Sequence, residues 1–180
     1  AMKTWPLLFL AMTLIGCKPA SPPVSSAAAQ PASSDLEYDA VNTPDGIVLR
    51  GEEKLSTPAR FEPPVEIKLI AKTDSTNLRL SYAADEVIFN WEDGRDQLRI
   101  DGGPANGLHR AGMGSVPTNE YVNIRWLVTT QRQAIYVNEK LRFEHSGDYS
   151  HLDRPMYVTP AMGSVVTVKS LKVKRLAHAP

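Results

Sequence analysis

Cysteine is almost absent from this 180-residue chain, which has a single one, at position 17. One thiol cannot form a disulfide within the chain or supply a cysteine-based metal site. An excess of charge is also missing, because 20 Lys and Arg balance 20 Asp and Glu. Nucleic-acid partners and electrostatic docking on anionic lipid both favour a basic excess, so we expect neither.

The N-terminal apolar run is shorter than a membrane-spanning helix. Residues 5–15 follow Lys3 and are typical of the apolar region of a secretory signal peptide. The next residues complete the segment Leu14-Ile15-Gly16-Cys17, which resembles a bacterial lipobox. This resemblance implies cleavage before Cys17 and acylation of that residue, which would hold the protein on a membrane surface. An ordinary signal peptide with an incidental cysteine is the alternative.

Three segments are predicted along the chain. Residues 1–16 form the signal peptide, with Ala1 interpreted as a cloning remnant, and residues 17–35 form the lipidated Cys17 and a disordered tether rich in Pro, Ser and Ala. Residues 36–180 form the folded domain. We expect it to face an extracytoplasmic space, anchored to the cell envelope. Lys18 follows the cysteine instead of Asp, which in lipoproteins of enteric-type bacteria implies the outer membrane.

Apolar residues in the folded domain recur with period two, which predicts β-strands with one face in water. The alternation is clearest at residues 65–72 and 78–82. Further strands are expected at residues 46–50, 86–91, 96–101, 121–130, 133–138, 141–145, 156–159 and 164–176. About ten short antiparallel strands favour an all-β sandwich or jelly roll of two packed sheets, with a closed barrel as the alternative. The last strand loses its alternation near Ser170, which predicts a bulge, and we expect it to pair near the first strand.

Two consecutive segments, Tyr121-Val122-Asn123-Ile124-Arg125-Trp126 and the stretch from Ala134 to Leu141, resemble a strand and hairpin of concanavalin A-like lectin and glucanase (LamG-like) domains. Glu139 stands where such hairpins commonly have Gly. The resemblance implies a two-sheet jelly roll, glycan contact on a concave sheet or its rim loops, and in some members a structural calcium ion. No other cofactor is expected. Aspartates near loops that could supply calcium ligands are Asp93, Asp96, Asp101, Asp148 and Asp153.

No catalytic residues are predicted. Laminarinase-like enzymes of the superfamily carry E-x-D-x-E on one strand, and the acidic segment at residues 90–96 does not match it. Asp85 and Glu86 are adjacent, so on a strand they point to opposite faces. Ser115 lacks the frame of a nucleophile elbow. An enzyme that acts on sugars through an unrecognised site stays an alternative.

The best candidates for ligand binding are Asn90, Trp91 and Glu92. An indole can stack on a sugar ring while amide and carboxylate groups bind its hydroxyls. Strand parity puts Trp91 on the face of Val87 and Phe89, so burial in the core is the alternative. Trp126 is expected in the core by the same parity.

The Gly-rich loop at residues 102–118 adds His109 and Arg110 as candidates, because long loops without secondary structure often bind ligands. A flexible connection is the alternative there. The sequence thus favours a membrane-anchored, non-catalytic lipoprotein that binds a glycan or polysaccharide. A structural or protein-binding subunit of a cell-envelope assembly is the alternative.

Overall fold

The computed structural model describes residues 37–177. The predicted signal peptide, Cys17 and the tether lie outside these residues. The described part contains twelve β-strands joined by turns and loops. A search of that part for a helix long and apolar enough to cross a membrane found none.

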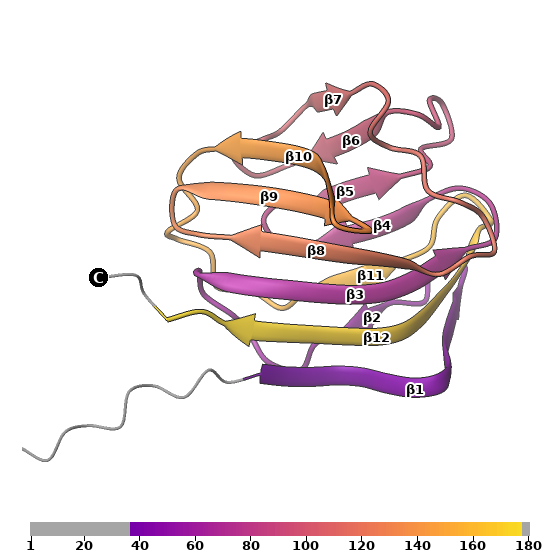
Figure 1. Cartoon of the computed structure of the whole chain (residues 1–180), viewed down its shortest axis with the longest axis horizontal. Helices are drawn as coiled ribbons and strands as arrows, with labels where there is room; N and C mark the ends of the chain where they lie inside the picture. The colour runs from indigo at the N-terminus through magenta and orange to yellow at the C-terminus, as the bar shows by residue number, and fades with distance from the viewer. Residues whose placement is uncertain (1–36, 178–180) are drawn as a thin grey trace, which may run out of the picture. The chain divides into compact units, whose positions relative to one another are not determined.

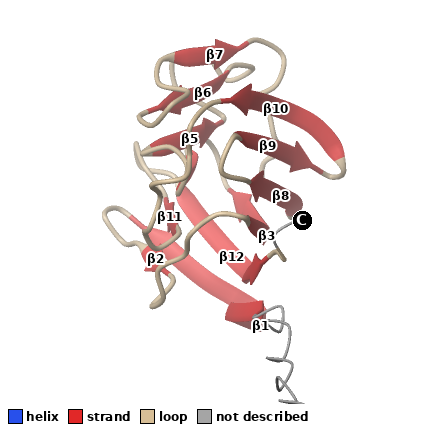
Figure 2. Ribbon diagram, turned by 90° about the vertical axis from the view of Figure 1, so that its left-hand side faces the viewer, coloured by secondary structure: helices blue, strands red, loops and turns tan. Residues whose placement is uncertain are grey.

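The strands form two antiparallel six-stranded sheets, which appear as two layers in Figures 1 and 2. Sheet A has the order β1 (Glu37–Arg50), β12 (Val165–Arg175), β3 (Val65–Thr73), β8 (Val122–Val128), β9 (Arg132–Val137) and β10 (Lys140–Ser146). Sheet B has the order β2 (Leu55–Ser56), β11 (Tyr157–Thr159), β4 (Leu78–Ser81), β5 (Glu86–Phe89), β6 (Leu98–Asp101) and β7 (Leu108–Arg110). The predicted all-β, two-sheet antiparallel sandwich is therefore confirmed.

The terminal strand behaves as the sequence predicts. β12 pairs with β1 on one side and with β3 on the other, and its register shifts between Val168 and Ser170. Two short strands, β2 and β7, were missed, because two or three residues are too few to show alternation. β7 lies inside residues 102–118, so the prediction of a loop without secondary structure is wrong there. β5 ends at Phe89, two residues before the predicted end.

One apolar core fills the space between the sheets, and its largest fully buried side chain is Trp126. The Trp126 Nε1 donates a hydrogen bond to Gln133 Oε1 (2.9 Å), and Gln133 Nε2 donates to the Tyr149 hydroxyl (2.9 Å). The His145 Nδ1 lies 2.8 Å from that hydroxyl. The buried polar groups around Trp126 are thus paired, as the interior of a stable protein requires. The expected core position of Trp126 is confirmed.

Glu139 lies in the two-residue turn of the β9–β10 hairpin. Asn138 and Glu139 have φ values of 49° and 62°, so both central turn residues are left-handed, as in a type I′ turn. This conformation favours Asn and Gly, and Glu139 adopts it against its intrinsic preference. The hairpin therefore forms a two-residue turn without a glycine.

Candidate functional site

Four strands of sheet B bring outward-facing residues into one row across the sheet. The register pairs Arg79 with Ile88, Ile88 with Arg99, and Arg99 with His109. Ile88 is 1% exposed although its side chain lies on the side of the sheet away from the core cluster. Larger side chains around Ile88 therefore cover it and build an outer layer on sheet B.

Trp91 belongs to this outer layer. Its indole ring lies 4.8 Å from the Arg99 guanidinium and meets the His109 ring edge-on, with centroids 5.2 Å apart. The side chain is half-buried and is not part of the core cluster. Its Nε1 is a buried donor that lacks a hydrogen-bond partner among residues 37–177. Such buried donors without a partner are rare in folded proteins.

Asn90 explains why Trp91 leaves the face predicted by strand parity. Asn90 has a φ of 50°, which ends β5 and turns the chain. Asn is among the few residues that tolerate this left-handed conformation. The following indole therefore turns away from Val87 and Phe89, which stay in the core.

The side chain of Asn90 fixes the rim of the site. It is 0% exposed; its Nδ2 donates to the Ser75 and Val116 carbonyls (3.2 and 3.0 Å), and its Oδ1 accepts from the Val116 N–H (2.9 Å). An amide committed to these backbone groups presents no surface to a ligand. The structure thus gives Asn90 a positioning role instead of the predicted ligand contact.

Ion pairs across the outer face orient its charged groups. Arg79 Nη1 lies 2.8 Å from Glu86 Oε2, and Arg79 Nη2 lies 3.7 Å from Glu92 Oε1. Beside Trp91, Arg99 Nε lies 2.8 Å from Asp101 Oδ2. The face therefore offers fixed hydrogen-bond donors and acceptors with carboxylates close to the arginines, an arrangement that suits a neutral polar ligand.

Of the other predicted residues, the structure brings Glu92 and His109 to this cluster, whereas Arg110 lies elsewhere. The His109 Nδ1 is 3.2 Å from Gln97 Oε1, which ties β7 to the turn that precedes β6. The Arg110 guanidinium lies 6.0 Å from the Phe143 ring, in a groove of about 490 Å³ between the edge strands β7 and β10. Arg79 and Arg99 were missed, although their alternation with buried leucines could have placed them on the outer face.

Gly114 joins the segment after β7 to the segment between β5 and β6. Its N–H donates to the Asp96 carbonyl (2.8 Å), and its carbonyl accepts from the Asn90 N–H (3.0 Å). A Cβ at this position would lie 2.1 Å from the backbone of Gln97, so a larger residue does not fit. The segment after β7 is therefore anchored against the strand end that carries Trp91.

A search of residues 37–177 for three or more His, Cys, Asp or Glu side chains grouped as metal ligands found none. Three of the aspartates considered above have other partners: Asp101 pairs with Arg99, Asp153 pairs with Arg60, and Asp148 accepts hydrogen bonds from the N–H and hydroxyl of Ser150. These hydrogen bonds lower the pKa of Asp148. The structural calcium ion stays a prediction.

Comparison with known proteins relates the chain to others by fold. No family model and no curated protein matches the sequence. Similar solved structures include the transglycosylase Crh5 (TM-score 0.58, 9% identity, 80% of this chain and 85% of that chain). Others are a Parabacteroides distasonis protein described as a glycosyl hydrolase (0.56, 15%, 75% and 89%) and the Caenorhabditis elegans galectin LEC-6 (0.51, 12%, 76% and 94%). The chain has the concanavalin A-like jelly-roll fold.

Proposed function

We propose that this protein binds glycans without catalysis, on the outer face of sheet B around Trp91. The observation that carries the proposal is the half-buried indole beside Arg99 and His109 on the outer face of the sheet. A pyranose packed on the exposed part of the indole would bury its apolar face. This stacking would act together with hydrogen bonds from the polar groups beside the ring.

The polar groups beside the indole suit sugar hydroxyls. Arg79 and Arg99 are held by carboxylates, so their remaining N–H groups have fixed directions. Preorganised groups lose less conformational entropy when a ligand binds. The fold likeness to a glycosyl hydrolase and a galectin supports a glycan as the ligand class.

The same ion pairs favour binding over hydrolysis. A glycosidase needs two carboxylates that face each other across the scissile bond with space for the sugar between them. Arg79 contacts both Glu86 and Glu92, and so occupies the place between these two carboxylates. Asp85, the neighbour of Glu86, pairs instead with Arg154 (3.0 Å). A glycosidase active site would need two carboxylates with open space between them, and at this site Arg79 occupies that space.

A screen of neutral glycans tests this proposal, run with and without calcium. We expect wild-type protein to bind a neutral glycan and Trp91→Ala to weaken that binding by about tenfold or more, because the stacking surface is lost. Tyr121→Ala is the matched control, since it removes an exposed aromatic ring outside sheet B and should change affinity little. Silence across a broad array, or unchanged affinity in Trp91→Ala, would contradict the proposal and favour a protein-binding subunit of an envelope assembly.

We also propose that lipidation of Cys17 anchors the protein to the cell envelope, in the outer membrane if the cell has one. The lipobox-like segment that ends at Cys17 supports this proposal. A fatty-acid analogue fed to cells that express the full chain should label wild-type protein, and Cys17→Ser should abolish the label. Equal labelling of the two proteins would contradict the anchor.

A further inference from the structure

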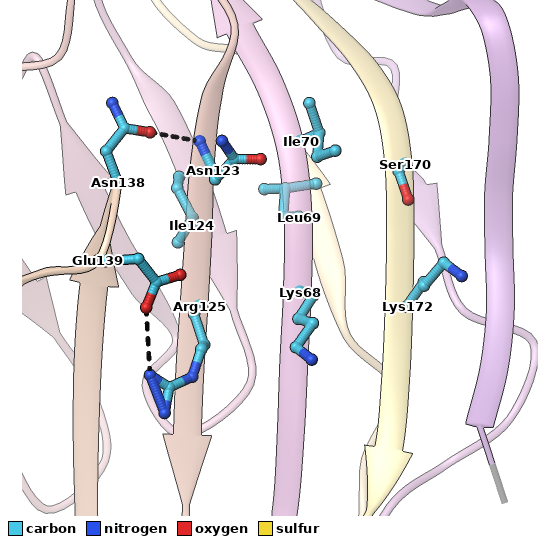
Figure 3. A pocket seen from close by; sticks show the side chains of 10 residues that line it. All are labelled: Lys68, Leu69, Ile70, Asn123, Ile124, Arg125, Asn138, Glu139, Ser170 and Lys172. Atoms are coloured by element: carbon cyan, nitrogen blue, oxygen red, sulfur yellow. Dashed lines mark hydrogen bonds and ion pairs between the residues drawn. The ribbon is translucent and has the colours of Figure 1, made fainter.

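Ion pairs link charged groups beside the pocket of about 320 Å³ on the outer face of sheet A. Glu66 lies 3.1 Å from Lys68 Nζ and 3.0 Å from Arg125 Nε. Figure 3 shows the further ion pair of Arg125 with Glu139 at this pocket. The two arginines in the groove between β7 and β10 differ, because no carboxylate within residues 37–177 pairs with them.

This second groove, called the edge groove below, has a volume of about 490 Å³. It lies between β7 and β10, the last strands of sheets B and A, which Figures 1 and 2 show at the same end of their layers. Met113 and Leu141 line it and are 39% and 46% exposed. An edge strand also leaves a row of backbone N–H and C=O groups unpaired. An extended chain laid in the groove would contact both the apolar side chains and these backbone groups.

Arg110 turns toward the interior of the sandwich at this edge. It pairs in register with Leu98, a core residue, and residues at directly opposite positions share one face of a sheet. Its guanidinium lies 6.0 Å from the centroid of the Phe143 ring, within the range of a cation–π contact. This contact holds the positive charge of Arg110 in the groove.

Arg142 supplies a second positive charge, from the other sheet. It lies at the bulge in β10, where the register shifts between Leu141 and Phe143. Its Nη1 donates to the carbonyls of Met113 and Ser115 (3.3 and 3.4 Å). These acceptors are neutral, so they position the guanidinium without cancelling its charge.

No carboxylate of the groove itself balances these two arginines. Among the described residues that line it, Glu144 alone is acidic, and its Oε1 lies 3.1 Å from the Arg132 Nε on the neighbouring strand. The edge groove therefore combines two fixed cations, exposed apolar surface and unpaired strand edges. A ligand that matches it carries carboxylates, apolar groups and a backbone that can form hydrogen bonds.

The two arginines also decide which strands the edge accepts. Inward-pointing charges at an edge are one means by which proteins prevent pairing with unrelated strands. An uncharged strand would cover Arg110 and Arg142 and leave both charges without a partner, which is costly. A strand with carboxylates at alternate positions would pair with both. The arginines thus reject most strands and select an acidic one.

We propose that the edge groove binds an extended acidic segment of a partner protein, which adds to β10 as a further strand. Carboxylates of that segment pair with Arg110 and Arg142, and its apolar side chains pack on Met113 and Leu141. Backbone hydrogen bonds supply affinity and the side-chain contacts supply specificity, as in other cases of strand addition. The proposal concerns a different ligand from that of the Trp91 site and does not depend on it.

Fluorescence anisotropy with two labelled peptides tests the proposal. One peptide alternates glutamate and valine, and the other has glutamine in place of each glutamate. We expect the glutamate peptide to bind at least about tenfold more tightly, because only its carboxylates form charge-assisted pairs with the arginines. Added salt should weaken its binding.

Charge variants locate the binding. R110Q/R142Q should bind the glutamate peptide about tenfold or more weakly. R50Q/K54Q removes the same charge at exposed positions in β1 and just before β2, the opposite edge strands, and should bind like wild type. Arg110→Gln alone keeps the Arg142 hydrogen bonds and should have an affinity between those of the two double variants. Thermal unfolding should show that R110Q/R142Q is folded.

Amide hydrogen exchange separates strand addition from a simple ionic contact. Bound glutamate peptide should slow exchange of amides in β10, while amides in β1 at the opposite edge keep their rates. The proposal is overturned if the glutamate peptide does not bind, if both double variants lose affinity equally, or if the peptide binds without slowing exchange in β10. It is also overturned if oligogalacturonate, an acidic saccharide, protects β10 and the peptide does not.

Discussion

Trp91 and Trp126 both belong to patterns that predict a buried tryptophan, yet they lie in contrasting surroundings. Trp126 is 0% exposed between the sheets, and its Nε1 donates to Gln133. Trp91 lies on the outer layer of sheet B, and its Nε1 lacks a partner among the described residues. The difference indicates that Trp126 serves the packing of the core, whereas part of the Trp91 ring lies at the surface, where a ligand can contact it.

Removal of the buried Trp126 ring should cause the largest loss in the free energy of unfolding. Trp126→Ala should lower the free energy of unfolding by about 3–5 kcal/mol, because it leaves a cavity in a close-packed core. Trp91→Ala should lower it by far less, since that side chain is half-buried on an outer face. Urea denaturation of the two variants measures the difference. Equal losses of stability in the two variants would contradict the contrast between Trp126 and Trp91.

Loss of Gln133, the hydrogen-bond partner of Trp126, should have the next largest effect on stability. Gln133→Ala leaves the Trp126 Nε1 and the Tyr149 hydroxyl without their hydrogen bonds to that amide, and should lower the free energy of unfolding by about 1–3 kcal/mol. Gln131→Ala is the matched control at an exposed position two residues earlier, where we expect a change within about 0.5 kcal/mol. If both variants have wild-type stability in urea, the buried hydrogen bonds contribute nothing.

Tyr82 packs edge-on against Trp126, and its hydroxyl donates to the Phe61 carbonyl (3.0 Å). Tyr82→Phe should lower the free energy of unfolding by about 1 kcal/mol. Burial raises the pKa of Tyr82, so the folded state favours the neutral phenol. Its contribution is present below the unfolded pKa of about 10 and is lost as the pH rises toward the folded pKa.

Chemical denaturation at a series of alkaline pH values measures this effect. Tyr82→Phe should lose less stability above about pH 10 than wild type. Parallel curves for wild type and Tyr82→Phe would contradict the role assigned to burial.

The smallest change in the free energy of unfolding is expected outside the core, and it is an increase instead of a loss. Glu139→Gly should raise the free energy of unfolding by about 0.5–1 kcal/mol, because glycine adopts the left-handed turn conformation without strain. Differential scanning calorimetry would detect it as a higher Tm. A lower Tm would mean that the Glu139 ion pair with Arg125 outweighs the relief of strain.

Much of the fold could be predicted from period-two alternation, which located β3, β4, β8 and the bulge in β12. The same alternation failed at Trp91, because a single left-handed residue, Asn90, ends the strand and reverses the face of its neighbour. Sequence periodicity carries no information about that dihedral angle. The edge strand β7 was missed because three residues are too short a pattern.

The candidate site was predictable only in part. Trp91, Glu92 and His109 were selected for their chemistry, and the structure brings them to one surface, while Arg79 and Arg99 join them through cross-strand register. Register between distant segments cannot be read from local alternation.

The indole N–H signals in an NMR titration with a neutral saccharide test the central claim most directly. We predict that the Trp91 signal, assigned through Trp91→Phe, shifts as saccharide is added, because a sugar ring packed on the indole changes its chemical environment. The Trp126 signal should stay in place, since its N–H already donates to Gln133 within the core. A titration in which saccharide binds while the Trp91 signal does not move, or in which Trp126 shifts instead, would contradict the account.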